Sequence, residues 1–180
     1  MAGQTEYEAV QRFRESLHRT LSCVLRGTYI DVKGGHYPSP RPHPLTLMDG
    51  LPVELGRGTG LSVRVSQQYR LVESPSATKP WRVTTVAYHY TLQESGGPEI
   101  LSYQWHPNVP NSVSFPHLHI GPGAGLGREE FDRAHLPTGR VTLEAFVRLL
   151  IEDFEVPPEK ENWEDELDES LAEFQEDRSW

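Results

Sequence analysis

One of the two long β-strand patterns in this chain is WRVTTVAYHYTL, which runs from Trp81 to Leu92. Val, Thr and Tyr are enriched in strands because branched and aromatic side chains pack well on a pleated surface. A turn-forming segment, Glu94–Pro98, follows it, and the next strand pattern runs from Ile100 to His106. Together these segments predict a β-hairpin.

Two further strand patterns lie on either side of the hairpin. Apolar Leu61, Val63 and Val65 alternate with polar residues and predict a strand over 61–72, and another strand is expected over 113–120. Four consecutive strands favour an antiparallel meander, because antiparallel neighbours need only short connections.

Helical patterns lie towards both ends of the chain. Apolar residues at spacings of three and four predict helices over 6–26, 143–154 and 161–176. The segment 31–60 is interrupted by proline and glycine and is expected to form loops. We therefore expect an α+β fold, in which an antiparallel sheet of about four strands is flanked by an N-terminal helix and C-terminal helices.

The charge of the chain is unevenly distributed. The net charge at pH 7 is −9, but the stretch 152–180 holds 13 acidic residues against Lys160 and Arg178. Residues 1–156 are expected to form a single α+β domain, and 157–180 an acidic C-terminal helix that docks on it or extends from it. That helix is expected either to aid solubility or to lie across a basic site as an inhibitor.

The cysteine content and the hydropathy of the chain predict its compartment. The chain has 180 residues and a single cysteine, Cys23, so it cannot form an internal disulfide. The N-terminus lacks a basic region followed by an apolar run, and no apolar stretch approaches the roughly 18 residues that span a membrane. These features predict a cytoplasmic protein with no membrane partner.

Histidines form the most informative motif of the chain, PHLHIG at 116–121. Side chains alternate along a strand, so His117 and His119 are expected on one face, and Leu118 and Ile120 on the other. Two imidazoles about 7 Å apart at their Cα atoms suit three kinds of site. They bind a metal, act as an acid–base pair, or hold an anion such as phosphate.

Further histidines and an arginine are expected near this motif. His89 and His106 lie on predicted neighbouring strands and are candidates for the further ligands that a metal needs. His135 and Arg140 precede the helix over 143–154, whose N-terminus attracts anions, and arginine adds bidentate phosphate contacts. This wider set favours acid–base chemistry on phosphate, with no metal and no cofactor.

The favoured interpretation assigns these residues to two roles. The candidate catalytic residues are His117, His119, His89 and Arg140, and the candidate substrate-binding residues are His135, Tyr103, His106 and Arg128. Such groups are the equipment of a metal-independent ribonuclease. One group takes the 2′-hydroxyl proton, another protonates the leaving oxygen, and a cation stabilises the phosphorane. RNA or a nucleotide is the expected substrate.

The layout of these motifs resembles small bacterial proteins of the TumE type, which are grouped as toxins of toxin–antitoxin pairs. The matching segments are Tyr88–Tyr90, Pro116–His119 and the helix that begins at Leu143, and the resemblance as a whole covers roughly 61–154. The chain departs from this pattern by an added N-terminal helix, a proline-rich loop and the acidic C-terminal helix. The resemblance implies a toxin or antiviral defence enzyme, with an antitoxin or a defence-complex subunit as its partner.

Two alternatives stay open at this point. A non-catalytic protein-interaction module would bind an antitoxin or a complex subunit through the aromatic face of the sheet and the acidic tail. A histidine-ligated metal enzyme would carry zinc, iron or manganese, and would lose the metal when His117 is replaced.

Overall fold

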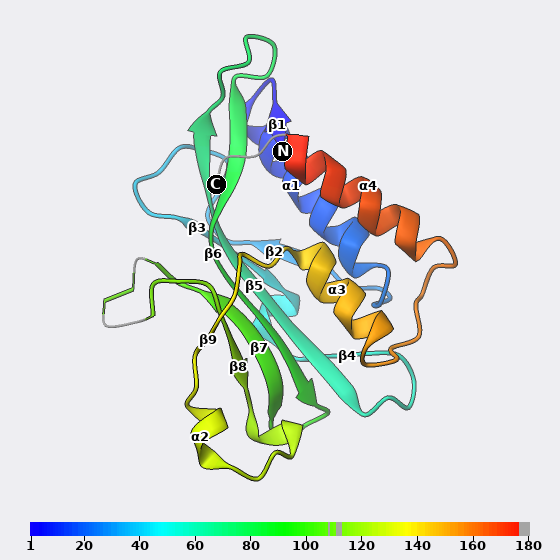
Figure 1. Cartoon of the computed structure of the whole chain (residues 1–180). Coiled ribbons are helices and arrows are strands. Elements are labelled where there is room, and N and C mark those ends of the chain that lie inside the picture. Colours follow the sequence, from blue (N-terminus) through cyan, green and yellow to red (C-terminus); the bar gives the residue numbers. More distant parts are fainter. Residues whose placement is uncertain (108, 111–112, 177–180) are drawn as a thin grey trace.

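The fold is built around one antiparallel β-sheet, seen in the computed structural model in Figure 1. The structure describes residues 1–107, 109–110 and 113–176. Within them the strands are β1 (Ala2–Gly3), β2 (Ile30–Val32), β3 (His43–Leu47), β4 (Val53–Glu54), β5 (Leu61–Glu73), β6 (Trp81–Glu94), β7 (Glu99–Trp105), β8 (His117–Ile120) and β9 (Leu136–Pro137). The strand order is β2-β3-β5-β6-β7-β8-β9, while β1 pairs with β6 and β4 pairs with β5.

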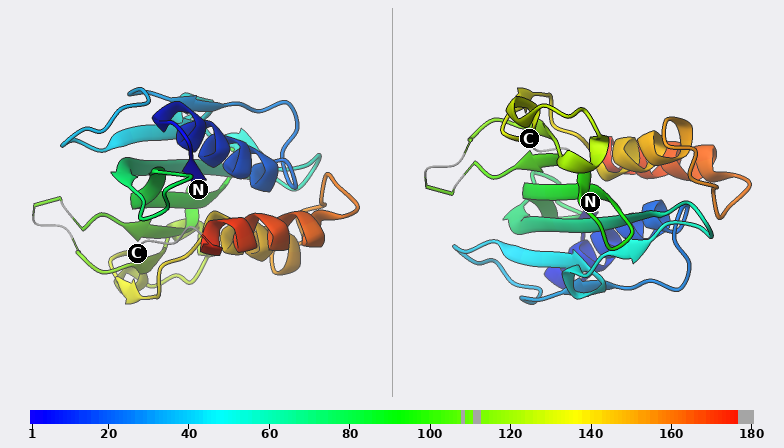
Figure 2. Two further views of the ribbon diagram at one scale, coloured as in Figure 1. Left: turned by 90° about the horizontal axis from the view of Figure 1, so that it is seen from above. Right: turned by 90° about the horizontal axis from the view of Figure 1, so that it is seen from below.

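The longer helices gather on one side of this sheet. The described helices are α1 (Glu6–Leu21), α2 (Glu129–Asp132), α3 (Leu143–Glu152) and α4 (Trp163–Glu176), with short 3₁₀ turns η1 (Met48–Gly50) and η2 (Pro122–Ala124). In both views of Figure 2, α1, α3 and α4 lie apart from α2, which contacts β8. Helix α3 begins at an N-cap, because the Thr142 hydroxyl accepts the Ala145 N–H at 3.2 Å.

The hydrophobic core lies between the sheet and α1, α3 and α4. Alternate residues of the central strands face these helices, and Tyr90 of β6 lies opposite Tyr103 of β7. The ring of Tyr90 stacks on Phe146 of α3 with centroids 5.5 Å apart, and Phe13 of α1 lies 5.7 Å from Tyr69 of β5. Large aromatic side chains therefore attach both helices to the same face of the sheet.

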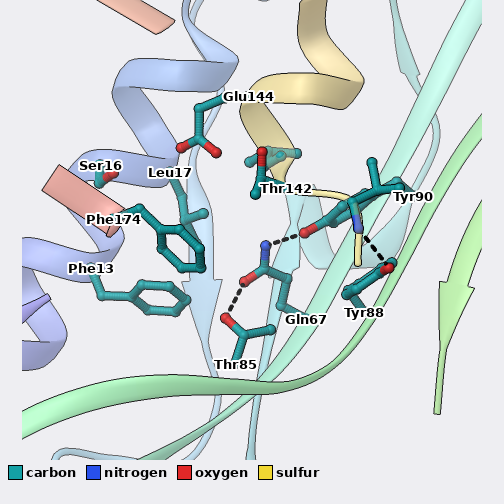
Figure 3. A pocket seen from close by; sticks show the side chains of 12 residues that line it. Phe13, Ser16, Leu17, Gln67, Thr85, Tyr88, Tyr90, Thr142, Glu144 and Phe174 are labelled. Atoms are coloured by element: carbon teal, nitrogen blue, oxygen red, sulfur yellow. Dashed lines mark hydrogen bonds between the residues drawn. The ribbon is translucent and has the colours of Figure 1, made fainter. Parts of the chain in front are cut away.

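A small cavity lies inside this core, as Figure 3 shows. The amide of Gln67 donates to the Tyr90 hydroxyl at 2.6 Å, and the Thr85 hydroxyl donates to the Gln67 carbonyl oxygen at 3.5 Å. The Val141 N–H donates to the Tyr88 hydroxyl at 2.9 Å. The volume of about 20 Å³ suits a single water molecule, so this cavity belongs to the packing and fits no substrate.

The sheet is larger than the four strands expected from the sequence, so that part of the predicted fold class is wrong. The four predicted strands correspond to β5, β6, β7 and β8. Strands β2 and β3 lie in the segment that was predicted to form loops. A strand was not predicted there because proline rarely occurs within a central strand, yet β3, which contains Pro44, pairs on both sides. Strands β1, β4 and β9 are each two residues long, too short for an alternating pattern.

The helices follow their predicted positions with shorter bounds. The helix predicted over 6–26 ends at Leu21, with Ser22 as its C-cap. The last predicted helix begins at Trp163 instead of residue 161. Residues 177–180, the end of the predicted acidic segment, lie outside the described residues.

Candidate metal centre

The sheet face turned away from α1, α3 and α4 carries histidines and other polar residues. Pairing places Gln104 of β7 opposite both His89 of β6 and His117 of β8, while Ser102 lies opposite His119. Paired residues point to the same side of a sheet, which confirms the prediction that His117 and His119 share a face. We call this surface the histidine face and define it by His89, Ser102, Gln104, His106, His117 and His119.

Three imidazoles meet at the edge of this face, where β8 pairs with β9. The ring centroids of His117 and His119 are 5.0 Å apart, and the His135 ring lies 4.9 Å from the first and 4.3 Å from the second. Their potential ligand nitrogens all lie within 4.8 Å of one another. His117 is buried, His119 is partly exposed and His135 is exposed, so the three-histidine cluster opens to solvent on one side.

The glycine-rich segment 121–127 leads the chain from β8 back towards this cluster. Gly121 has no room for a side chain, because a Cβ there would lie 2.2 Å from the Glu99 carbonyl oxygen. Gly125 has a φ of 66°, in the left-handed region that favours glycine. After this turn β9 pairs with β8, and His135 directly precedes β9. The approach of the third imidazole thus depends on pairing at the sheet edge.

A hydrogen bond to the backbone orients His117. Its Nδ1 lies 2.8 Å from the carbonyl oxygen of Phe115. Because a carbonyl oxygen only accepts, Nδ1 carries the hydrogen and donates it, which leaves the lone pair on Nε2. Metal-binding histidines are commonly fixed through their other ring nitrogen in the same manner. The Nε2 atom of His117 is therefore available to coordinate a metal.

Burial and neighbouring histidines favour the neutral imidazole at His119 and at His106. Burial lowers the pKa of His119 below its ordinary value of 6.5, and His135 and His117 lower it further. Burial and His117 also lower the pKa of His106. A neutral imidazole keeps a lone pair for a metal ion, whereas a protonated one does not.

The three-histidine cluster needs only modest side-chain rotation to hold a metal ion. Tetrahedral zinc with Zn–N distances of about 2.0–2.1 Å places its ligand nitrogens about 3.3 Å apart. His119 and His135 are exposed enough to turn towards the buried His117. Among the described residues, no carboxylate or thiolate belongs to the group. Three protein ligands with a further position open to solvent are typical of a catalytic metal site.

His89 and His106, which the sequence suggested as further ligands, lie outside this three-histidine cluster. Their rings meet edge to face with centroids 6.0 Å apart. Burial lowers the pKa of His89 to about 4, with smaller contributions from His106 and other nearby cationic groups. The Nε2 atom of His89 is buried and has no hydrogen-bond partner in the described part of the chain. Both histidines therefore support the polar face without joining the cluster.

Arg140 and Tyr103, predicted to act beside the histidines, lie on the other side of the sheet. The Arg140 guanidinium lies over the Trp105 ring, 3.7 Å from its centroid, and Trp105 is part of the core. Tyr103 meets Phe146 of α3 edge-on, with centroids 6.4 Å apart. This placement corrects the prediction, because the sheet separates both side chains from the histidine face.

Arg128 lies in the exposed segment between η2 and α2. Its guanidinium pairs with Glu130 at 3.4 Å. Within the described residues, no polar contact joins Arg128 to the three histidines. Its predicted role in substrate binding therefore gains no support from the geometry.

The acidic helix α4 docks on the helix side of the sheet. Arg19 of α1 pairs with Glu173, and Arg148 of α3 pairs with Asp168, each at 2.6 Å. Leu167 of α4 is fully buried in the core. Helix α4 therefore does not lie across the histidine face, which corrects the prediction of an inhibitory tail over the site.

The aromatic side of the sheet is also closed. Tyr88, Tyr90 and Trp105 are only 2, 1 and 7 % exposed, because the helices cover them. Of the two surfaces proposed for an interaction module, this aromatic face is therefore covered, while the acidic helix α4 keeps an exposed acidic side. The interaction module through the acidic helix stays a prediction.

Sequence reasoning missed His135 as the third member of the cluster and placed it with the substrate. The available signal was the glycine-rich segment 121–127, which can turn the chain back along the preceding strand. Gln104 was also missed, although alternation places it on the same face as His106, two residues away. Both residues meet their partners through strand pairing, His135 beside β8 and Gln104 opposite His89 and His117, and these partners are distant in sequence.

No protein-family model, curated protein or solved structure matches this chain. The resemblance to TumE-type toxins, the antitoxin or defence-complex partner and the cytoplasmic location therefore stay predictions. Among the described residues, no helix combines the length and the apolar character needed to cross a membrane.

Proposed function

We propose that His117, His119 and His135 together bind one divalent transition-metal ion, and that the protein is a metal-dependent enzyme. The observation that carries this proposal is the distance between their potential ligand nitrogens, all within 4.8 Å of one another. Imidazole suits zinc, copper, iron and nickel. We take zinc as the test metal, because three histidines with an open position form one of its established catalytic ligand sets.

Hydrolysis is the reaction class that this ligand set supports best. Imidazoles are uncharged, so the bound ion keeps its full double charge and lowers the pKa of a coordinated water towards 7. The open side of the cluster leaves room for that water and for a substrate oxygen. His106 shares the face and favours its neutral form, so it is the candidate base that takes the proton of that water.

The proposal departs from the metal-independent ribonuclease that the sequence favoured. That mechanism needs a cation beside the histidines to stabilise negative charge on phosphate. Arg140, the residue expected to supply it, stacks on Trp105 on the other side of the sheet. A metal ion held by the three-histidine cluster supplies the positive charge instead, and phosphate esters stay within the range of substrates.

The test is zinc binding by calorimetry to chelator-treated protein, with the metal content measured by mass spectrometry. We expect one zinc per chain. His135→Ala should weaken binding about a hundredfold or more, since even a residue that only supports a metal ligand contributes about ten- to hundredfold. Because His135 is exposed, this variant should keep the fold. His117→Ala should lose the metal as well. Because His117 is buried, this variant can also destabilise the fold, so His135→Ala is the better test.

An exposed histidine on α1 provides the matched control, and His18→Ala should bind zinc as the parent protein does. Zinc should also raise the melting temperature of the parent protein and of His18→Ala, but not of His135→Ala. If His135→Ala and His18→Ala bind zinc equally well, the three-histidine cluster is not the site and the proposal fails. Hydrolysis of a chromogenic phosphodiester then tests the reaction class, and it should require both zinc and His135.

A further inference from the structure

A polar cavity of about 410 Å³ opens in the sheet surface that carries the histidine face. Strands β5, β6 and β7 form its floor, and Gly50 of η1 and Gly97 of the β6–β7 turn contribute to its walls. The polar side chains that line it are Arg64, Ser66, His89, Thr91, Gln93 and Glu99. Cavities of this size accommodate small organic ligands.

Arg64 provides the positive charge of this cavity. Its side chain is exposed, and within the described residues it makes no ion pair or hydrogen bond. Arg19 and Arg148 on the helix side, by contrast, are both paired with carboxylates. A guanidinium binds carboxylate or phosphate oxygens through two parallel hydrogen bonds. Arg64 is therefore suited to hold the oxyanion of a ligand.

Glu99 provides an acceptor on the other side of the cavity. Its carboxylate accepts the Ser102 hydroxyl at 2.7 Å, and the Ser102 oxygen accepts the Gln104 amide at 2.9 Å. A carboxylate has further acceptor capacity beyond that one bond. Two strand spacings and a two-residue step separate Arg64 from Glu99, about 12 Å between Cα atoms. A ligand that reaches both needs an oxyanion at one end and hydroxyl or amino donors at the other.

The cavity is continuous with the histidine face. His89 lines it, and its ring meets that of His106. The hydrogen bonds from Glu99 through Ser102 to Gln104 lead from the cavity towards the three-histidine cluster, since Gln104 lies opposite His117. The register also aligns Arg64, Thr91, Ser102 and His119 in one row across the sheet.

The backbone of η1 at the cavity wall is strained. Met48 and Asp49 have φ values of 44° and 57°, and Gly50 follows with 81°. The carboxylate of Asp49 is held by the Tyr29 hydroxyl and by Lys33. Non-glycine residues in the left-handed region are uncommon and tend to occur at ligand clamps and active sites. The wall of the cavity thus combines strained backbone at η1 with the charged side chains of the sheet.

We infer that this cavity binds a phosphate ester that carries hydroxyl groups, with its phosphate on Arg64 and its hydroxyls donating to Glu99. The inference rests on the proposed function, because the ligand is part of the substrate on which the metal acts. Arg64 and His119 are three strand spacings apart, about 14 Å. The bond that is cleaved therefore lies well beyond the phosphate held by Arg64, in a substrate longer than one sugar phosphate.

Calorimetry with inorganic phosphate, ribose 5-phosphate and ribose tests the inference on the purified chain. We expect ribose 5-phosphate to bind more tightly than phosphate, and ribose alone to bind weakly. Arg64→Gln should weaken the binding of both phosphates about tenfold or more, because a charge-assisted contact is lost. Glu99→Gln should weaken the binding of ribose 5-phosphate, whose hydroxyls lose the carboxylate acceptor. The same variant should not weaken the binding of inorganic phosphate, because it removes a negative charge from the cavity.

Arg57 is exposed on the loop before β5 and lines none of this cavity, so Arg57→Gln is the matched control. The inference fails if Arg64→Gln and Arg57→Gln bind phosphate equally, or if the parent protein binds neither phosphate. His135→Ala separates the two proposals, since it should weaken zinc binding about a hundredfold or more and keep the affinity for ribose 5-phosphate. If the parent protein binds zinc but no phosphate, the inference fails and the proposed function stands. If it binds ribose 5-phosphate but no zinc, the proposed function fails, and of the inference only phosphate binding by the cavity stands.

Discussion

The two faces of the sheet are made from the same strands but differ in how their polar atoms are paired. On the helix side, even the buried Gln67 amide and the Tyr90 hydroxyl are hydrogen-bonded to each other. On the histidine face, the Nε2 atom of His89 is buried without a partner in the described residues. Folding favours paired polar atoms, because an unpaired buried one lowers stability. The helix side therefore stabilises the fold, and the face with the unpaired buried nitrogen is the one for which we propose a binding role.

The largest expected effect tests whether stability resides on the helix side. Phe146 is 1 % exposed and contacts Tyr90 and Tyr103, so Phe146→Ala should lower the free energy of unfolding by about 3–5 kcal/mol. Exposed His135→Ala should change it by only about 0.5 kcal/mol in metal-free protein. Urea denaturation measures both values. Equal losses for the two variants would contradict the division between the faces.

Local patterns in the sequence predicted the long elements of the fold, but not the full size of the sheet. The Val, Thr and Tyr content of 81–92 and the apolar stripe of 143–154 are local features of the sequence, and both segments form the predicted elements as β6 and α3. Strand β3 was missed because Pro44 outweighed its short apolar pattern, although pairing on both sides stabilises it. The size of the sheet depends on such long-range pairs, which no local pattern contains.

The candidate site shows a similar limit. His117 and His119 could be predicted as a pair because they alternate within one strand. His135 joins them only through the pairing of β9 with β8. Arg140 was expected at the histidines because it precedes a helix N-terminus, but the chain has crossed to the helix side by that residue. Sequence proximity to a motif did not determine which face of the sheet a side chain reaches.

The second prediction concerns the pH dependence of the histidine face. Burial first, and then His106 and other nearby cationic groups, lower the pKa of His89 from 6.5 to about 4. Below pH 6.5 the unfolded chain binds a proton at His89 that the folded chain rejects. The free energy of unfolding should therefore be highest above pH 6.5 and decrease down to pH 4. The expected loss is of the order of 2–3 kcal/mol in metal-free protein.

A His89→Gln variant isolates this contribution, because glutamine does not titrate. Its stability should decrease less between pH 6.5 and pH 4 than that of the parent protein, as measured by urea denaturation at a series of pH values. His18→Gln on α1 replaces an exposed histidine and should keep the parent pH dependence. Parallel curves for the parent protein and His89→Gln would mean that His89 does not carry the effect.

The third prediction returns to the helix side, where buried polar groups serve the fold. Glu144 of α3 is 5 % exposed and accepts the hydroxyls of Ser170 at 2.8 Å and of Thr20 at 3.3 Å. Glu144→Ala leaves both hydroxyls without this acceptor and should lower the free energy of unfolding by about 1–3 kcal/mol. Zinc affinity should stay unchanged, because this carboxylate lies on the side away from the three-histidine cluster. A loss of zinc affinity would show that the two faces are coupled.

The smallest effect is expected for the ion pair between α3 and the acidic helix. Arg148 and Asp168 are 32 and 71 % exposed in their side chains, so solvent screens their contact. Asp168→Asn should lower the free energy of unfolding by about 0.5 kcal/mol, and added salt should remove most of that difference. Helix α4 is held mainly by the buried Leu167, so Leu167→Ala should cost several times more, about 2–5 kcal/mol. If Asp168→Asn proves as damaging as Leu167→Ala, the charge of α4 serves docking, and solubility is not its main role.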